Sequence, residues 1–307
     1  MERFPQIVLL AMLAFAVFAA PQLRAQVRLP EVEANAAPPS AMPASAPLDA
    51  DPQFECGRPH KVIDTLGWAI GIPRKIILWD RRAVNHDVSP KTEDSLAEYL
   101  NANNMTSTKI RINEYDPGGE WRRLGANKNV GAGWRYTFGA FGTLGYTLFP
   151  GRLFGADGYN PYTDSLYIYS DIPSVAQEQA AYAKLVKQHS HPGTYVAVTS
   201  LPFVRLWPEK QSKDDVLDYT IAHGTLDEKR AAIHAMYPEY GAEVADELTQ
   251  FVPGGFLITA AGAGLGHVAA HFDAREAAER TPESPSAERP VDETAKSDAV
   301  VPASFSR

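Results

Sequence analysis

Apolar and polar positions change their spacing several times along the chain, and each change predicts a different element. Residues 108–115 (TKIRINEY) alternate, with Ile110 and Ile112 on one side, which is typical of a half-buried strand. The apolar run at residues 166–169 (LYIY) predicts a second strand, and residues 75–79 (KIILW), which follow a proline, predict a third.

Helical spacing begins after Ser89 and Pro90, an N-cap residue followed by proline at the first helical position. Leu96, Tyr99 and Leu100 then form one apolar face. Short strands among longer helices predict an α+β fold. Three more helices are expected: one that ends near residue 184, one over 209–222 and one over 226–236.

Two apolar segments stand out, residues 136–150 and residues 251–272. The first is too short to cross about 30 Å of hydrocarbon as a helix. The second lacks Asp, Glu, Lys and Arg and is rich in Gly and Ala, which allows close helix packing in a membrane or in a soluble core. Both alternatives stay open, and we expect shallow membrane association mainly through residues 251–272.

The N-terminus has the order of features of a secretory signal peptide. Arg3 precedes an apolar run over residues 7–20, and Ala25 is a small residue at a plausible cleavage point, so residues 1–25 are predicted to be a signal peptide. An uncleaved anchor is the alternative. We therefore expect an exported protein of the periplasm or cell envelope, in which the single cysteine, Cys56, cannot form an internal disulfide.

Composition limits the class of protein. Hydrophobic residues make up 45% of the 307 residues, enough for a sizeable core, and the net charge of −8 comes with no strongly basic block, so nucleic acid is excluded as the expected partner. Residues 26–54, rich in Pro and Ala, and residues 275–307 are predicted to be a flexible linker and a flexible tail. The folded domain is then expected over residues 55–274.

The helix that ends near residue 184 carries Gln177-Glu178-Gln179-Ala180-Ala181. In an HExxH zinc peptidase, two histidines one helical turn apart bind zinc, and the glutamate that follows the first histidine activates the zinc-bound water. The third ligand is often a glutamate on a later helix, and Glu209 follows about 30 residues on. The central Glu178 is present here, but Gln177 and Ala181 stand at the two histidine positions.

Further motifs carry a resemblance to a known family over residues 62–271. With the QEQAA helix they resemble a bacterial group of exported or membrane-associated zinc-peptidase-like proteins of the HExxH, gluzincin type. The motifs lie at residues 113–117 (NEYDP), 120–123 (EWRR), 150–155 (PGRLFG), 159–163 (YNPYT), 169–171 (YSD) and 237–241 (YPEYG).

The resemblance implies a zincin-like α+β core and a set of site positions. Glu178 is the former catalytic residue, and Gln177, Ala181 and Glu209 are the former metal-ligand positions, with Gln177 and Ala181 expected to point toward Glu209. The peptide-edge strand is expected at the strand that precedes the helix, with residues Leu166, Tyr167, Ile168 and Tyr169.

These positions predict that zinc is lost, because glutamine is a poor zinc ligand and alanine is none. We therefore expect no cofactor, and a non-catalytic, degenerate metallopeptidase-like protein of the cell envelope that binds a protein or peptide. One alternative is an active metal-dependent hydrolase with a non-standard ligand set. The other is a structural envelope protein unrelated to peptidases.

Overall fold

A four-stranded mixed sheet lies at the centre of the computed structural model, which describes residues 53–249 and 255–280. Its strand order is β1-β2-β4-β3, and the predicted α+β class is confirmed. β1, β2 and β4 run parallel, with Ile110 opposite Leu166, and β3 is antiparallel to β4. The strands are β1 (Phe54–Cys56), β2 (Lys109–Ile112), β3 (Gly158–Asn160) and β4 (Ser165–Ile168).

The helices of the N-terminal half are α2 (Lys61–Ile70), α3 (Ile72–Leu78), α4 (Pro90–Ala102) and α5 (Pro117–Ala126). The strand predicted at residues 75–79 is wrong, because this run lies in α3. Lys75 and Leu78, three residues apart, are buried on one side of that helix, and the ammonium of Lys75 donates to the carbonyl oxygen of Val84 at 2.8 Å. The apolar run is therefore compatible with one buried helix face, and Trp79 ends the helix with φ at 50°.

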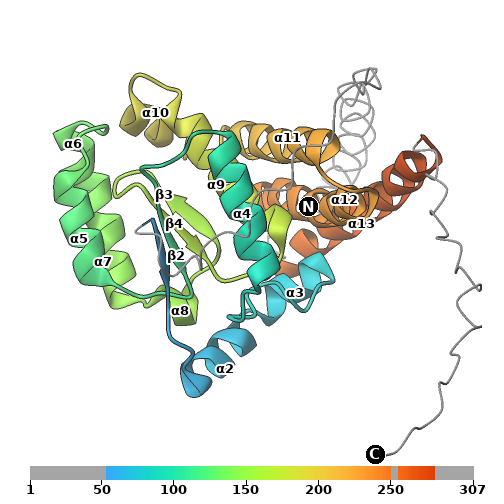
Figure 1. The fold of residues 1–307 in the computed structure, drawn as a ribbon, viewed down its shortest axis with the longest axis horizontal. Coiled ribbons are helices and arrows are strands. Elements are labelled where there is room, and N and C mark those ends of the chain that lie inside the picture. The colour runs from blue at the N-terminus through green and yellow to red at the C-terminus, as the bar shows by residue number, and fades with distance from the viewer. Residues whose placement is uncertain (1–52, 250–254, 281–307) are drawn as a thin grey trace, which may run out of the picture.

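The first apolar segment, residues 136–150, forms short helices beside α5 at one end of the molecule (Figure 1). Many of its large side chains are exposed, including Phe138 and Phe141. The elements here are α6 (Ala132–Trp134), the π-helix η2 (Arg135–Gly139), α7 (Ala140–Leu148) and α8 (Gly151–Phe154).

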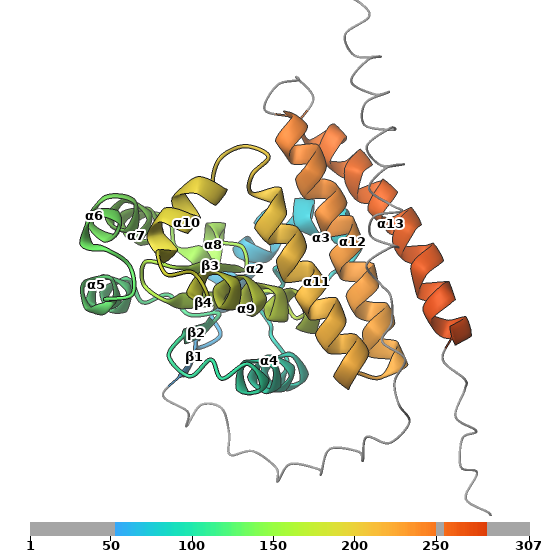
Figure 2. The same cartoon turned by 90° about the horizontal axis from the view of Figure 1, so that it is seen from above.

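The C-terminal half is helical, and its last three helices lie on the side of the sheet opposite to α5–α7 (Figures 1 and 2). α9 contacts both the sheet and these helices. α12 and α13 pack backbone to backbone, since a methyl group added to Gly241 would collide with the carbonyl oxygen of Gly262. The elements are α9 (Pro173–Lys187), α10 (Pro192–Thr199), α11 (Leu206–His223), α12 (Leu226–Thr249) and α13 (Gly255–Arg280).

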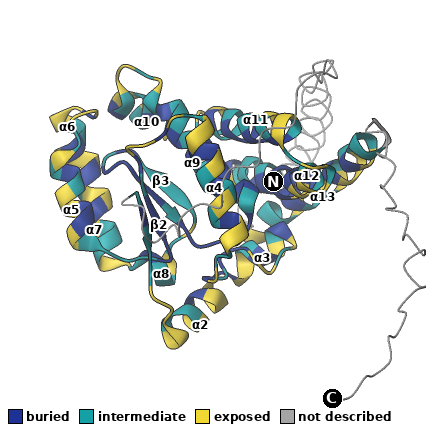
Figure 3. Cartoon of the chain, in the orientation of Figure 1, coloured by how far each residue is buried: buried dark blue, intermediate teal, exposed yellow. Residues whose placement is uncertain are grey.

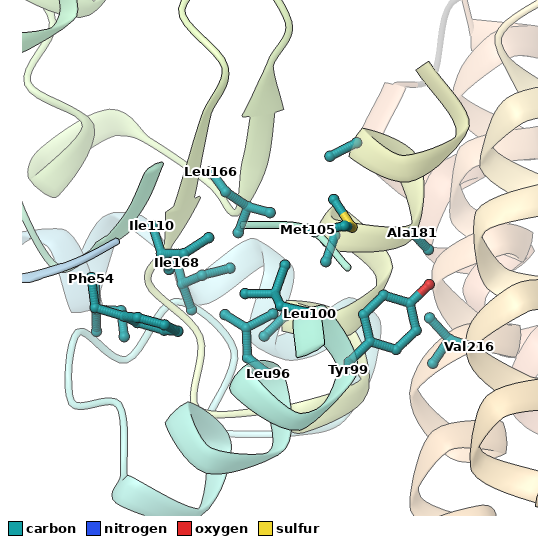
Figure 4. Close-up of a cluster of buried hydrophobic side chains, with 14 residues drawn as sticks. Phe54, Leu96, Tyr99, Leu100, Met105, Ile110, Leu166, Ile168, Ala181 and Val216 are labelled. Atoms are coloured by element: carbon teal, nitrogen blue, oxygen red, sulfur yellow. The ribbon is translucent and has the colours of Figure 1, made fainter. Parts of the chain in front are cut away.

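The main hydrophobic core joins the sheet to α4, α9 and α11 (Figure 4). Ile110 and Leu166 from neighbouring strands meet Leu96 of α4, and Ala181 of α9 lies near Val216 of α11. Burial follows this arrangement, with the central strands β2 and β4 and helix α9 largely buried and α2 largely exposed (Figure 3). The core therefore holds α9 against the sheet on one side and leaves another side of α9 facing α11 and α12.

Several predicted boundaries can be compared with the described residues. The signal peptide and most of the linker, residues 1–52, lie outside them, but β1 already begins at buried Phe54, inside the predicted linker. The tail was predicted to begin at residue 275, yet α13 continues to Arg280. Residues 255–278 are long and apolar enough to cross a membrane by length and composition alone, a property that a core helix can share.

Candidate functional site: a buried cluster of carboxylates and cations

Glu178 is directed from α9 into the layer formed by α11 and α12. Proline at the first position starts the helix, and small residues at 176, 180 and 183 pack in the main core. Glu178 lies on another side of the helix and is only 1% exposed. A carboxylate this deeply buried is costly unless a cation or a proton accompanies it.

The ammonium of Lys213 lies between two carboxylates. It forms an ion pair with Oε1 of Glu178 and donates to Oε1 of Glu243 at 3.0 Å. Lys213 comes from α11 and Glu243 from α12, so the cluster ties three helices together. A second cation, Arg74 of α3, is ion-paired with Glu239, one helical turn before Glu243.

Carboxylates outnumber cations in this cluster. Glu178, Glu209 and Glu243 each have an oxygen within 4.8 Å of the other two. Glu239 is a fourth carboxylate, and Lys213 and Arg74 are two cations, which leaves two negative charges to be balanced when all groups are ionised. Two protons or one divalent cation would balance that charge.

The pKa values of the cluster show where protons are held. Burial raises the pKa of Glu178 well above its ordinary value, and the nearby Glu239 carboxylate raises it further despite the attraction of Lys213. Burial also raises the pKa of Glu243 to about 7. Burial raises the pKa of Glu239 as well, but the positive charges of Arg74 and Lys213 outweigh burial and lower it below the ordinary value. Protons therefore concentrate on Glu178 and Glu243.

The cations keep their charge. Burial lowers the pKa of Lys213, but the surrounding carboxylates, Glu178 first, raise it well above the ordinary value. Burial lowers the pKa of Arg74 too, and Glu239 more than compensates. Lys213 is therefore a permanent ammonium in the centre of the cluster at physiological pH.

The predicted site residues are only partly brought together. Glu178 and Glu209 meet, but the amide of Gln177 donates to Oγ of Ser95 on α4 at 2.9 Å, and Ala181 is part of the main core. Successive residues are about 100° apart around a helix. Gln177 therefore faces α4, whereas Glu178 faces Glu209, so the prediction that Gln177 points toward Glu209 is wrong. For Ala181, which packs in the core, the same expectation stays a prediction.

The predicted peptide-edge strand is not at an edge of the sheet. Leu166 and Tyr167 of β4 are paired with β2 on one side and with β3 on the other, and Ile168 is paired with β2. The backbone carbonyl of Tyr169 accepts a hydrogen bond from the N–H of His86. The edge strand beyond β4 is β3, which precedes β4 in the chain and which the sequence pattern did not indicate.

Sequence reasoning also missed Lys213, Glu239, Glu243 and Arg74. One regular feature was available: α12 has glutamates at 239, 243 and 247, spaced by four residues on one side of the helix. Glu239 and Glu247 are almost fully buried in the structure. A row of acids in a segment that also has a regular apolar row indicates that both sides of the helix are covered.

The motifs that carry the family resemblance have structural roles in this chain. Glu120 accepts a hydrogen bond from Nε of Arg111 at 2.8 Å, and both side chains are buried. Arg123 donates to the carbonyl oxygens of Thr163 and Asp164 at 2.8 and 2.7 Å, which fixes the turn between β3 and β4.

Other motif residues connect separate elements in the same way. Arg152 binds Asp64 at 2.7 and 3.0 Å and so attaches α8 to α2. Asp171 accepts hydrogen bonds from the N–H and hydroxyl of Ser89 and from the hydroxyl of Thr92, at the start of α4. These motifs report on how the domain is held together, and none of these contacts requires a catalytic site.

The zinc that the resemblance implies does not fit the residues present. The three candidate ligands are all carboxylates, a donor set that suits hard cations such as Mg²⁺, Mn²⁺ or Ca²⁺ better than zinc. The ammonium of Lys213 also contacts Glu178 and Glu243, two of those ligands.

A separate pocket of about 260 Å³ lies between α3, α12 and α13. Trp79 stacks on His267 there, with ring centroids 4.0 Å apart, and Arg82 and His234 also line it. It contains none of the predicted site residues.

Comparison of the chain with family models, with curated proteins and with solved structures found no match in any of the three. The buried cluster is therefore interpreted from its own geometry, and the family resemblance remains a prediction.

Proposed function

We propose that this protein is a non-catalytic, degenerate zinc-metallopeptidase-like protein of the cell envelope that binds a protein or peptide. The observation that carries the proposal is the ammonium of Lys213, held between Glu178 and Glu243. A peptidase of the HExxH type needs a metal there and a glutamate free to take a proton from the metal-bound water. Glu178 has a lysine as its partner and sits out of contact with solvent, so it supports structure and not hydrolysis.

Peptide binding is supported by the sheet edge. β3 is one of the two edge strands of this sheet, is half-buried, and contacts α9, the helix that carries Glu178. An extended chain can add to such an edge through backbone hydrogen bonds, a mode that needs no metal. This proposal moves the expected peptide-binding edge from β4 to β3.

Two measurements test the proposal. Elemental analysis of the purified protein should find far less than one zinc per chain, and labelled casein should remain intact. Extended peptides should bind. N-methylation of every second peptide residue should abolish binding when it falls on one alternate set, odd or even, and should leave binding unchanged on the other set, because only alternate N–H groups face the edge. One tightly held zinc per chain, with casein cleavage lost in Glu178→Gln, would contradict the proposal.

A metal-dependent hydrolase with a non-standard ligand set is the second candidate. It is favoured by one observation, the convergence of Glu178, Glu209 and Glu243 within 4.8 Å. Under this reading, hydrolysis of ester or peptide substrates should require Mn²⁺ or Mg²⁺ and should be lost in Glu209→Gln. Glu209 is half-exposed, so this variant should fold normally, and its circular dichroism spectrum provides the control.

A further inference from the structure

Helices α2 and α3 carry much exposed apolar surface. Val62, Leu66 and Ile70 follow each other at intervals of four residues on α2 and are 65%, 53% and 47% exposed. Ile76 on α3 and Trp79 at its C-terminal end are 49% and 75% exposed. These five residues are called the α2–α3 surface, and α2 is mainly yellow in Figure 3. Apolar surface left outside on this scale marks an interaction site.

The contacts of the two helices explain why this side remains outside. Gly67 is the buried residue of α2, and it lies against the ring of His86 and the carbonyl of Arg152 so closely that any side chain would collide. On α3, Lys75 and Leu78 face inward. Each helix is therefore attached by its other side, and the apolar residues are held outward by packing.

Neighbouring elements extend the apolar character. α8 contacts α2, and Phe154 at its end is exposed beside Phe149. On the other side, Trp79 stacks on His267 of α13, where Val268 and Phe272 are exposed. The apolar region thus continues onto the helix whose length and composition would allow it to cross a membrane.

The charge around the surface is opposite to that of the whole chain. Residues 58–82 contain six Arg and Lys against two Asp, whereas the whole protein has a net charge of −8. Of the six, Lys75 is buried and Arg74 is ion-paired with Glu239. The two acids are ion-paired, Asp64 with Arg152 and Asp80 with Arg82. Arg58, Lys61 and Arg81 are exposed.

We infer that the α2–α3 surface docks on an anionic lipid bilayer, with the two helices lying in the interface. Basic residues beside exposed Leu, Ile and Trp are the combination that such interfacial helices use, and indoles favour the boundary between hydrocarbon and headgroups. A symmetric contact with a second copy would place this basic surface against itself, so the local positive charge favours anionic lipid as the partner. This inference does not rest on the proposed function.

The test uses the full chain in sedimentation with two kinds of vesicle, phosphatidylcholine alone and phosphatidylcholine with 30% phosphatidylglycerol. Partitioning should be at least about tenfold stronger into the anionic vesicles, and the difference should shrink at high salt. Equal binding to both vesicles at low salt would overturn the electrostatic half of the inference.

Paired variants locate the contact. Leu66→Ser with Ile76→Ser should weaken partitioning into anionic vesicles at least about tenfold. The control, Phe138→Ser with Phe141→Ser, removes two side chains of η2 and α7 that are even more exposed, and it should leave partitioning unchanged. Replacing Arg58, Lys61 and Arg81 by glutamine should cost about fivefold per residue on anionic vesicles only.

Two results would overturn the inference. If both serine pairs bind vesicles as the parent protein does, the membrane contact lies elsewhere, for example on α13 alone. If the parent binds no vesicles but forms a dimer by light scattering, and Leu66→Ser with Ile76→Ser makes it monomeric, the surface belongs to a second copy. All replaced side chains are exposed, so unchanged circular dichroism spectra are expected throughout.

Discussion

The molecule contains two buried ionic networks, and they compensate their buried carboxylates in different ways. On the sheet, Glu120 accepts hydrogen bonds from Arg111 at 2.8 Å, from the hydroxyl of Ser165 at 2.8 Å and from the hydroxyl of Tyr167 at 2.5 Å. Both of its oxygens are therefore occupied. The guanidinium of Arg111 also pairs with Glu55, so both carboxylates of this network have a cation as partner.

The network between α9, α11 and α12 is incomplete in the ionised state. One oxygen of each of Glu178, Glu239 and Glu243 is buried and has no hydrogen-bond partner among the described residues. A proton on Glu178 turns that carboxyl into a donor, and its hydrogen bond helps to lower the pKa of Glu239. The comparison shows that a buried ionic network can be fixed by hydroxyl donors or left dependent on protons, and only the second kind can respond to pH or to cations.

The largest expected effect is that of removing the central cation. Lys213→Met leaves Glu178, Glu239 and Glu243 with Arg74 as their remaining cation, and the free energy of unfolding at pH 7 should fall by about 5 kcal/mol. Urea denaturation measures the loss. Millimolar Mn²⁺ should restore stability only if Glu178, Glu209 and Glu243 close around a cation. The control is Lys210→Met, which removes the partly exposed ion pair between Lys210 and Asp214 on the same helix and should cost less than about 1 kcal/mol.

The second largest loss of stability is expected from breaking the network around Glu120. Glu120→Gln keeps the shape of the side chain but removes the charge that balances buried Arg111, so stability should fall by about 3 kcal/mol. Glu55→Gln, which removes the more exposed partner of the same arginine, should cost less than about 1 kcal/mol. Equal losses in the two variants would mean that Arg111 is stabilised mainly from the solvent side.

The pH dependence of stability should come from the incomplete network. The folded-state pKa of Glu243 is about 7, above the ordinary value of 4.5, so the folded state binds more protons than the unfolded state between these values. The contribution of this group to the free energy of unfolding is fully present below pH 4.5 and is lost as pH rises toward 7, by about 3.5 kcal/mol at 1.4 kcal/mol per pH unit.

The measurement is the difference between the parent and Glu243→Gln across pH 5 to 8. Burial lowers the pKa of His86, which acts in the opposite direction because that group gains stability as pH rises through its ordinary value of 6.5. The difference between the two proteins isolates Glu243. A difference that does not change with pH would show that Glu243 is ionised throughout.

The smallest effect is expected at Glu178, although it is as buried as Glu120. Its raised pKa means that glutamine resembles the protonated form of the folded state, which then no longer has to take up a proton on folding. Glu178→Gln at pH 6 should therefore cost no stability. Denaturation of this variant beside Glu120→Gln compares the two networks directly. Losses of similar size would remove the distinction between them.

The sequence predicted elements wherever spacing was regular. β2 and α4 follow from alternation and from the Ser89–Pro90 start, and α11 was found with its start set three residues late. The prediction for residues 75–79 was wrong because four apolar residues in succession, Ile76 to Trp79, fit a strand as well as a helix with one side buried. Only the contact between Lys75 and Val84, fixed by tertiary structure, separates the two.

The candidate site was predicted in part, for a similar reason. The resemblance pointed to Glu178 and Glu209, which do meet, but the helix side that faces Glu209 follows from how α9 packs against α4, a long-range property. Glu239, Glu243 and Lys213 were missed because charged residues on helices usually face solvent. α11 and α12 bury them only because α3, α9 and α13 cover those helices.

The glycine contact between α12 and α13 limits how these two helices can move relative to each other. Gly241 and Gly262 bring the two backbones together, and Gly266 does the same against the backbone of Tyr237. Where two helix backbones touch directly, no side chains lie between them that could rearrange to let the helices slide. We therefore expect α12 and α13 to move together. A change in the tilt of α13 should therefore also tilt α12, the helix that carries Glu239 and Glu243. The positions of these two carboxylates thus depend on α13.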